Sequence, residues 1–138
     1  MNNCFILLAA GKGSRMGNNT PKPLIPVMGK PMIKRILNTL KFLSFLDICI
    51  IVGHEAEKIK QSLGDDITYV LQKNQKGTGH AVKKAQKIIS KYQNILILPS
   101  DAPMISSKSI QQLYDSHINT NANCSFLSSV FPFKLPYA

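Results

Sequence analysis

The run Cys4-Phe-Ile-Leu-Leu-Ala-Ala-Gly-Lys-Gly-Ser-Arg-Met16 opens the chain and predicts a buried strand that leads into a tight, glycine-rich loop. Its first five residues are continuously apolar, which is typical of a strand covered on both faces. Gly11 and Gly13 follow, and glycine lets the backbone turn sharply and point its N–H groups at an anion. Arg15 and the nearby Lys22 add fixed positive charge. Together these features predict a polyphosphate site and favour a nucleoside triphosphate as its ligand.

Beyond this loop, short apolar runs alternate with amphipathic runs at helical spacing. This alternation predicts an α/β fold, a Rossmann-like and mainly parallel sheet with helices on both faces and right-handed crossovers. The expected further strands are 47–53, 67–71, 94–98 and one near 124–130, and the expected helices begin near Pro31, Glu55, Thr78 (or Gly77) and Ser107.

The residues with chemical interest follow strand ends. Gly11, Gln72 and Asp101 each lie at or just beyond the carboxyl end of an expected strand. Ligands of open parallel sheets bind outside these ends. We therefore expect a single mouth that collects the functional side chains.

Length and composition indicate one globular domain. The chain has 138 residues and 44% hydrophobic content, and no apolar run approaches the roughly 20 residues that span a bilayer. Its N-terminus lacks the pattern of a signal peptide, which favours a cytoplasmic location. The three cysteines, Cys4, Cys49 and Cys124, lie in apolar runs and are expected to be buried free thiols without metal spacing.

The net charge of +10 raises the possibility of nucleic-acid binding. Lysine is abundant along the whole sequence, however, and several lysines fall on the polar side of one helix. No interleaving of aromatic and basic residues or known reader motif is present. We expect neither a nucleic acid nor a membrane as a partner. The helical lysines are Lys83, Lys84, Lys87 and Lys91.

Two common phosphate-binding motifs are excluded. The loop has Met16 where the dinucleotide fingerprint needs glycine, and it lacks the Gly-Lys-Ser/Thr ending of a Walker A loop. Its pattern, followed by Pro21-Lys-Pro-Leu24 and Gly29-Lys-Pro-Met32, resembles the start of the sugar-phosphate nucleotidyltransferases. The run Gln72–Ala81 and the turn Ser100-Asp101-Ala-Pro-Met104 resemble, within that family, the uridyltransferase domains of bifunctional bacterial N-acetylglucosamine-1-phosphate uridyltransferases / glucosamine-1-phosphate acetyltransferases.

The resemblance implies a nucleotide-diphospho-sugar transferase type of fold and a Mg²⁺-dependent reaction. A uridylyl group passes from UTP to N-acetylglucosamine-1-phosphate, and UDP-N-acetylglucosamine, a precursor of peptidoglycan and lipopolysaccharide, is formed with pyrophosphate. Arg15 and Lys22 are the implied catalytic cations, Gln72 the implied partner of the uracil edge, and Asp101 the implied Mg²⁺ ligand. The implied substrate-binding residues are Leu8, Ala9, Ala10, Gly11, Gly13, Lys22, Gln72, Gln75, Gly77, Thr78, Ser100 and Asp101.

The chain departs from the family pattern at two places. Ser100 stands where glycine is common, and the sequence ends at Ala138, before the family's Tyr-Gly-Arg segment, its remaining sugar contacts and its left-handed β-helix with the trimer contacts. Residues 1–138 are thus expected to be an incomplete nucleotidyltransferase domain: a fragment, a split-gene product or a gene remnant.

Several alternative interpretations stay open. The truncated chain could bind nucleotide without catalysis, or it could be a relative with another base specificity, such as a molybdopterin nucleotidyltransferase or a thymidylyltransferase. Thr78 could serve only as a helix cap, and Gln75 could be a solvated loop residue. His54, His80 and His117 fit no nucleophile or metal set and are interpreted as packing or surface residues.

Overall fold

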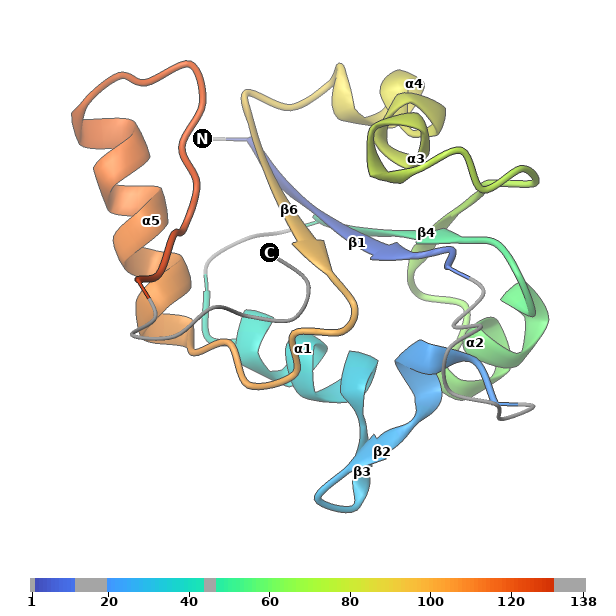
Figure 1. Ribbon diagram of the computed structural model, residues 1–138. Coiled ribbons are helices and arrows are strands. Elements are labelled where there is room, and N and C mark those ends of the chain that lie inside the picture. Colours follow the sequence, from blue (N-terminus) through green and yellow to red (C-terminus); the bar gives the residue numbers. More distant parts are fainter. Residues whose placement is uncertain (1, 12–19, 44–46, 131–138) are drawn as a thin grey trace. The chain divides into compact units, whose positions relative to one another are not determined.

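A computed structural model describes residues 2–11, 20–43 and 47–130 (Figure 1). The chain divides into two compact units, one ending at Ile105 and the other beginning at Ser106, and each is described by itself. Gly13 and Arg15 of the predicted site lie outside the described residues.

The first unit is built on a four-stranded sheet in which every pairing is parallel. Its strand order is β5-β4-β1-β6, so the chain first extends the sheet on one side of β1 and later adds a strand on the other. This arrangement confirms the predicted α/β fold with a mainly parallel sheet. The strands are β1 (Asn3–Ala9), β4 (Asp47–Val52), β5 (Thr68–Leu71) and β6 (Asn94–Pro99).

Helices cover both faces of this sheet, as predicted. In the view of Figure 1, α3 and α4 lie above the sheet, and α1 and α2 lie below it. The helix predicted from Thr78 is interrupted at Ala85, whose φ of −85° and ψ of 2° separate α3 from α4. The helices are α1 (Met32–Leu40), α2 (Ala56–Leu63), α3 (Thr78–Lys84) and α4 (Gln86–Ile89).

The core explains why β1 is continuously apolar. Cys4 and Ile6 pack with Cys49 and Ile51 of β4 in a cluster that includes Ala81. The alternate residues of β1, which point to the opposite face, are buried as well. A strand buried on both faces cannot show polar alternation, so its run of apolar residues is the sequence signature of the central position.

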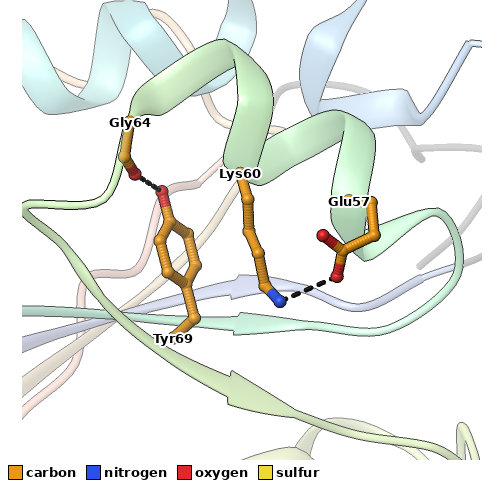
Figure 2. Close-up of polar contacts among 4 residues, drawn as sticks. All are labelled: Glu57, Lys60, Gly64 and Tyr69. Atoms are coloured by element: carbon orange, nitrogen blue, oxygen red, sulfur yellow. Dashed lines mark hydrogen bonds and ion pairs between the residues drawn. The ribbon is translucent and has the colours of Figure 1, made fainter.

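A hydrogen bond at the C-terminal end of α2 also anchors β5. Gly64 ends the helix with a φ of 89°, a left-handed conformation that favours glycine. The Tyr69 hydroxyl donates a 2.7 Å hydrogen bond to the Gly64 carbonyl, and Lys60 pairs with Glu57 at 2.8 Å within the helix (Figure 2). The strand and the helix end are therefore held together by a side chain.

A small hairpin between β1 and α1 was not predicted. The 3-10 helix η2 (Lys22–Leu24) leads into two antiparallel strands, β2 (Pro26–Val27) and β3 (Lys30–Pro31). Met28 and Gly29 between them have φ values of 49° and 77°. A two-residue turn with positive φ at both positions suits a hairpin, but methionine is not a residue that signals one.

The second unit corrects two predictions. It contains α5 (Ser107–Asn119), whose N-terminus is capped by the Ser106 hydroxyl accepting from the Ser109 amide at 3.0 Å. The strand predicted near 124–130 is wrong, since residues 124–130 have no regular secondary structure, and Cys124 is exposed instead of buried. Strand propensity is realised only where a neighbouring strand pairs, and no described strand pairs with these residues.

Within the described ranges, no helix combines the length and the apolar character needed to cross a membrane.

The three cysteines should differ sharply in reactivity. Burial, reinforced by the negative charge of Asp47, raises the pKa of Cys4 from 9.0 to about 11, and burial likewise raises the pKa of Cys49 to about 11. Cys124, by contrast, is exposed to solvent. We expect one thiol of the native protein to react rapidly with a small aromatic disulfide at pH 8, and Cys124→Ser to remove that fast phase.

The same shifts give a pH dependence of stability. The folded chain disfavours the thiolates of Cys4 and Cys49, so the two protonated thiols favour the folded state. Their contribution to the free energy of unfolding is fully present below pH 9 and is lost as the pH rises towards about 11.

For the reactivity prediction, rapid modification of all three thiols in the native protein would contradict the buried placement of Cys4 and Cys49.

Candidate functional site

A pocket of about 390 Å³ opens at the carboxyl ends of the central strands. β1 lies between β4 and β6, and Leu8 pairs with Ile51 on one side and Pro99 on the other. The chain changes its direction of growth across the sheet at β1, and crevices at such a switch point are where open α/β sheets bind ligands. The pocket is lined by Leu8, Ala10, Gly11, Lys22, Pro23, Gln72, Gln75, Gly77, Thr78, Ala81, Pro99, Ser100 and Asp101.

The exits of β1 and β6 form one wall. Hydrogen bonding continues past the end of β6, where the Ser100 amide donates to the Leu8 carbonyl at 3.1 Å. Ser100 is buried, whereas Asp101, the next residue, is exposed. The sheet thus fixes the backbone of the turn and leaves the carboxylate free to face a ligand.

The catalytic cation and the metal ligand of the sequence prediction lie side by side. The Lys22 Nζ is 2.6 Å from the Asp101 Oδ2, although 79 positions separate the two residues. Their side chains are 38% and 44% exposed, and ion pairs that accessible are weak and readily exchanged. Lys22 and Asp101 neutralise each other. A ligand that carries phosphates and a bound cation can take over both roles, with the phosphates pairing with Lys22 and the cation with Asp101.

Gln72 is the buried polar residue of the opposite wall, with 2% of its surface exposed. Its backbone amide donates to the Val52 carbonyl at 2.8 Å, which fixes the residue just beyond β5. Its side-chain Nε2 lies 3.2 Å from the Gly77 carbonyl and 2.9 Å from the His80 Nδ1. The carboxamide is therefore held at two points before any ligand arrives.

The loop from Gln72 to Gly77 closes on itself. The Gln75 Nε2 donates to the Gln72 carbonyl at 3.2 Å. Gly77 caps α3 with a φ of 94°, a left-handed conformation that favours glycine. Thr78 is the first residue of α3, so the residue at the N-cap position is Gly77 and not Thr78.

Most of the predicted binding residues meet in this pocket. Every one that lies in the described ranges is a lining residue except Ala9, which is buried within β1. Three lining residues, Pro23, Ala81 and Pro99, were not predicted as site residues. Pro23 and Ala81 belong to the motifs that carried the resemblance, so their place in those motifs is the signal that could have indicated them.

His80 is half-buried and makes a specific contact that was not predicted. It was interpreted as a packing or surface residue, but its Nδ1 contacts the Gln72 carboxamide. Sequence spacing could not show this, since the contact depends on how the loop after β5 folds back on α3.

Asp101 supplies the carboxylate of the pocket. Among the described residues, no group of three or more histidine, cysteine, aspartate or glutamate side chains could hold a metal ion. Mg²⁺, however, keeps several waters and is commonly held by one or two carboxylates together with substrate phosphates. Asp101, beside a cation and open to the pocket, fits that limited role and not a preformed metal cage.

Comparison with known proteins gives a consistent family. The profile of the family described as "MobA-like NTP transferase domain" matches residues 5–136. The bifunctional protein GlmU of Enterococcus faecalis is 41% identical over 129 residues, which are 93% of this chain and 28% of that relative. The chain therefore spans little more than a quarter of the length of this relative.

Solved structures show the same fold at low identity. Rv0371c from Mycobacterium tuberculosis in complex with manganese has a TM-score of 0.67 and 16% identity, over 83% of this chain and 59% of that one. CMP:2-keto-3-deoxy-manno-octonic acid synthetase complexed with CTP has a TM-score of 0.64 and 19% identity, over 88% and 49% of the two chains. At these identities the likeness establishes the fold alone.

Gly53, just after β4, should be required for the shape of the pocket. A Cβ atom there would lie 2.7 Å from the Ala10 carbonyl oxygen and 2.8 Å from the Gln75 Nε2, both in lining residues. We expect Gly53→Ala to lower the free energy of unfolding by about 1–3 kcal/mol, measured by urea denaturation, because the backbone must shift. Gly79→Ala in α3 is the control, since a Cβ there meets nothing within 4 Å. Equal stabilities of the two variants would argue against this packing.

Proposed function

The chain belongs to the family described as the MobA-like NTP transferase domain, and from that membership we propose that it is a Mg²⁺-dependent uridylyltransferase. Nucleotidyl transfer is the class of reaction that the family and the relatives support. The proposed substrates are UTP and N-acetylglucosamine-1-phosphate, and the products are UDP-N-acetylglucosamine and pyrophosphate. This chain spans 28% of the first of these relatives. We propose that it takes part in the same reaction as the full-length proteins.

One observation carries the proposal: a single pocket is lined both by a pair of charged side chains and by a buried carboxamide next to a helix N-terminus. The charged pair is Lys22 and Asp101, and the carboxamide is that of Gln72, next to Gly77 and Thr78. In the proposed binding mode these form the charged end and the base end of the pocket. A nucleoside triphosphate has this polarity, with an anionic tail and a base with hydrogen-bonding edges. The pocket's position at the switch point of the sheet agrees with it.

At the charged end, the proposed step is an in-line displacement at phosphorus. An oxygen of the sugar phosphate attacks the α-phosphorus of UTP, a new phosphorus–oxygen bond forms, and the bond to pyrophosphate breaks. Such a transfer needs positioning and electrostatic stabilisation, with no covalent enzyme intermediate. Lys22 leaves Asp101 to neutralise charge on the phosphates, the backbone around Gly11 approaches them, and Arg15 is proposed to assist from outside the described residues.

The metal proposal rests on Asp101. Mg²⁺ supplies charge neutralisation when it is bound between a carboxylate and phosphates. Asp101 would hold it once Lys22 has turned to the phosphates. The manganese complex of Rv0371c is compatible with a divalent cation at this fold, and Mg²⁺ is the ion that we propose for this chain.

At the base end, Gln72 is proposed to read uracil, and Gln75, Gly77 and Thr78 to complete the base pocket. Leu8, Ala10 and Ser100 line the space between the two ends, and Ala9 supports it from within β1. We propose a cytoplasmic enzyme with small-molecule partners, in which residues 1–138 contribute the nucleotide-binding part of the transferase domain.

Calorimetry with UTP, CTP, GTP and dTTP in the presence of Mg²⁺ tests the base assignment. We expect UTP to bind most tightly, because Gln72 is proposed to pair with the uracil edge. A preference for GTP or CTP would overturn the uridylyl assignment in favour of another member of the family. A pyrophosphate-release assay on the same sample separates a transferase from a chain that binds nucleotide without turning it over.

Lys22→Ala tests the charged end. We expect a loss of about 10²-fold or more in turnover, assayed by pyrophosphate release in a chain extended to full domain length, because charge that develops in the transition state loses its partner. Lys41→Ala is the matched control, since Lys41 is an exposed lysine that follows α1 and lies outside the pocket lining. Unchanged turnover in Lys22→Ala would remove Lys22 from the mechanism.

A further inference from the structure

We propose that His80 is a positioning residue that fixes the orientation of the Gln72 carboxamide, so that the pocket accepts a base with a ring N–H and rejects cytosine. The inference rests on the proposed function, since it takes the pocket to be a nucleotide site. It concerns a histidine to which the proposed reaction assigns no role.

The orientation of the amide follows from Gly77. A backbone carbonyl oxygen can only accept a hydrogen bond. The end of the Gln72 carboxamide that lies 3.2 Å from it must therefore be the NH₂ group, as the structure has it. The opposite orientation would place two acceptor oxygens against each other. Gly77 thus determines which end of the amide is nitrogen.

That orientation in turn determines the role of His80. The His80 Nδ1 lies 2.9 Å from the same Gln72 Nε2. An amide NH₂ group donates and does not accept, so Nδ1 must be the acceptor, and the neutral ring carries its proton on Nε2. His80 and the Gly77 carbonyl together use both hydrogens of the NH₂ group.

One atom of the amide is then left for a ligand. Gln72 is 2% exposed and lines the pocket, and its Oε1 accepts no hydrogen bond from any of the described residues. The Oε1 is not a buried atom without a partner, so water in the pocket can satisfy it and the donor of a ligand can take the place of that water. The amide therefore presents a fixed acceptor, and not a group that adapts to either kind of partner.

A fixed acceptor distinguishes the two pyrimidines. Uracil carries a hydrogen on N3 and can donate it to Oε1, whereas cytosine has a lone pair at N3 that would face the oxygen. To pair with the N3 of cytosine, the amide would have to turn over. Its oxygen would then meet the carbonyl oxygen of Gly77, and His80 would have to change from the Nε2–H to the Nδ1–H tautomer. The discrimination between uracil and cytosine thus arises from the Gly77 carbonyl and the His80 ring. These two groups hold the amide and do not themselves contact the base.

The test compares UTP and CTP on the native chain and on three variants. The two nucleotides have the same ribose and phosphates, so the ratio of their dissociation constants isolates the base. His80→Leu removes the acceptor. His80→Asn restores one, because the asparagine Oδ1 is separated from Cα by the same number of bonds as the histidine Nδ1. Lys84→Met is the control, since Lys84 lines a second pocket with His80 and does not line the pocket that contains Gln72.

We expect His80→Leu to reduce the preference for UTP over CTP about tenfold, the effect of one neutral hydrogen bond. His80→Asn should return the preference to within about threefold of the native value, and Lys84→Met should leave it unchanged. Thermal unfolding of each variant shows whether it is folded. A purely structural role for His80 would weaken UTP and CTP binding alike and leave their ratio intact.

The outcomes separate this inference from the proposed function. A native chain that does not prefer UTP over CTP overturns the uridylyl assignment itself. A native preference that His80→Leu leaves unchanged overturns only the role of His80. A preference that is lost in His80→Leu and not recovered in a folded His80→Asn also overturns it, because the acceptor would then not be the relevant property.

Discussion

The parallel pairing of β1 between β4 and β6 is the constraint on which the site depends. Because all the strands of this sheet run in one direction, their carboxyl ends meet at one edge. Leu8 and Pro99 pair at that edge, and the turn with Ser100 is bonded back to Leu8. Residues that lie far apart in the chain thereby become neighbours around one pocket. No local device could hold them together in this way.

The polar side chains of the pocket are paired with one another. Lys22 and Asp101 neutralise each other across its mouth, and the Gln72 carboxamide is held by Gly77 and His80. The two arrangements differ in their consequence. The ion pair is accessible and exchangeable, so it can give way to phosphates and a cation. The buried amide is fixed, which is the property that the proposed selection among bases requires.

The strengths and failures of the sequence prediction have physical reasons. The strands with continuous apolar runs were predicted well, because burial on both faces leaves a strong pattern at Cys4–Leu8 and 47–53. The break at Ala85 was missed because the apolar spacing continues through it. The strand near Cys124 was predicted wrongly, because an apolar run is realised as a strand only beside a partner.

For the site, the amino-acid sequence alone determined which chemical groups are available: the loop glycines, Lys22, Gln72 and Asp101, each in a recognisable motif after a strand. It also determined the class of fold, since the alternation of strands and helices is local. The side-chain contacts of Lys22 with Asp101 and of Gln72 with His80 could be seen only in the tertiary structure. These contacts depend on strand order and on the path of the loop before α3, and no periodicity along the chain encodes the distance between two side chains.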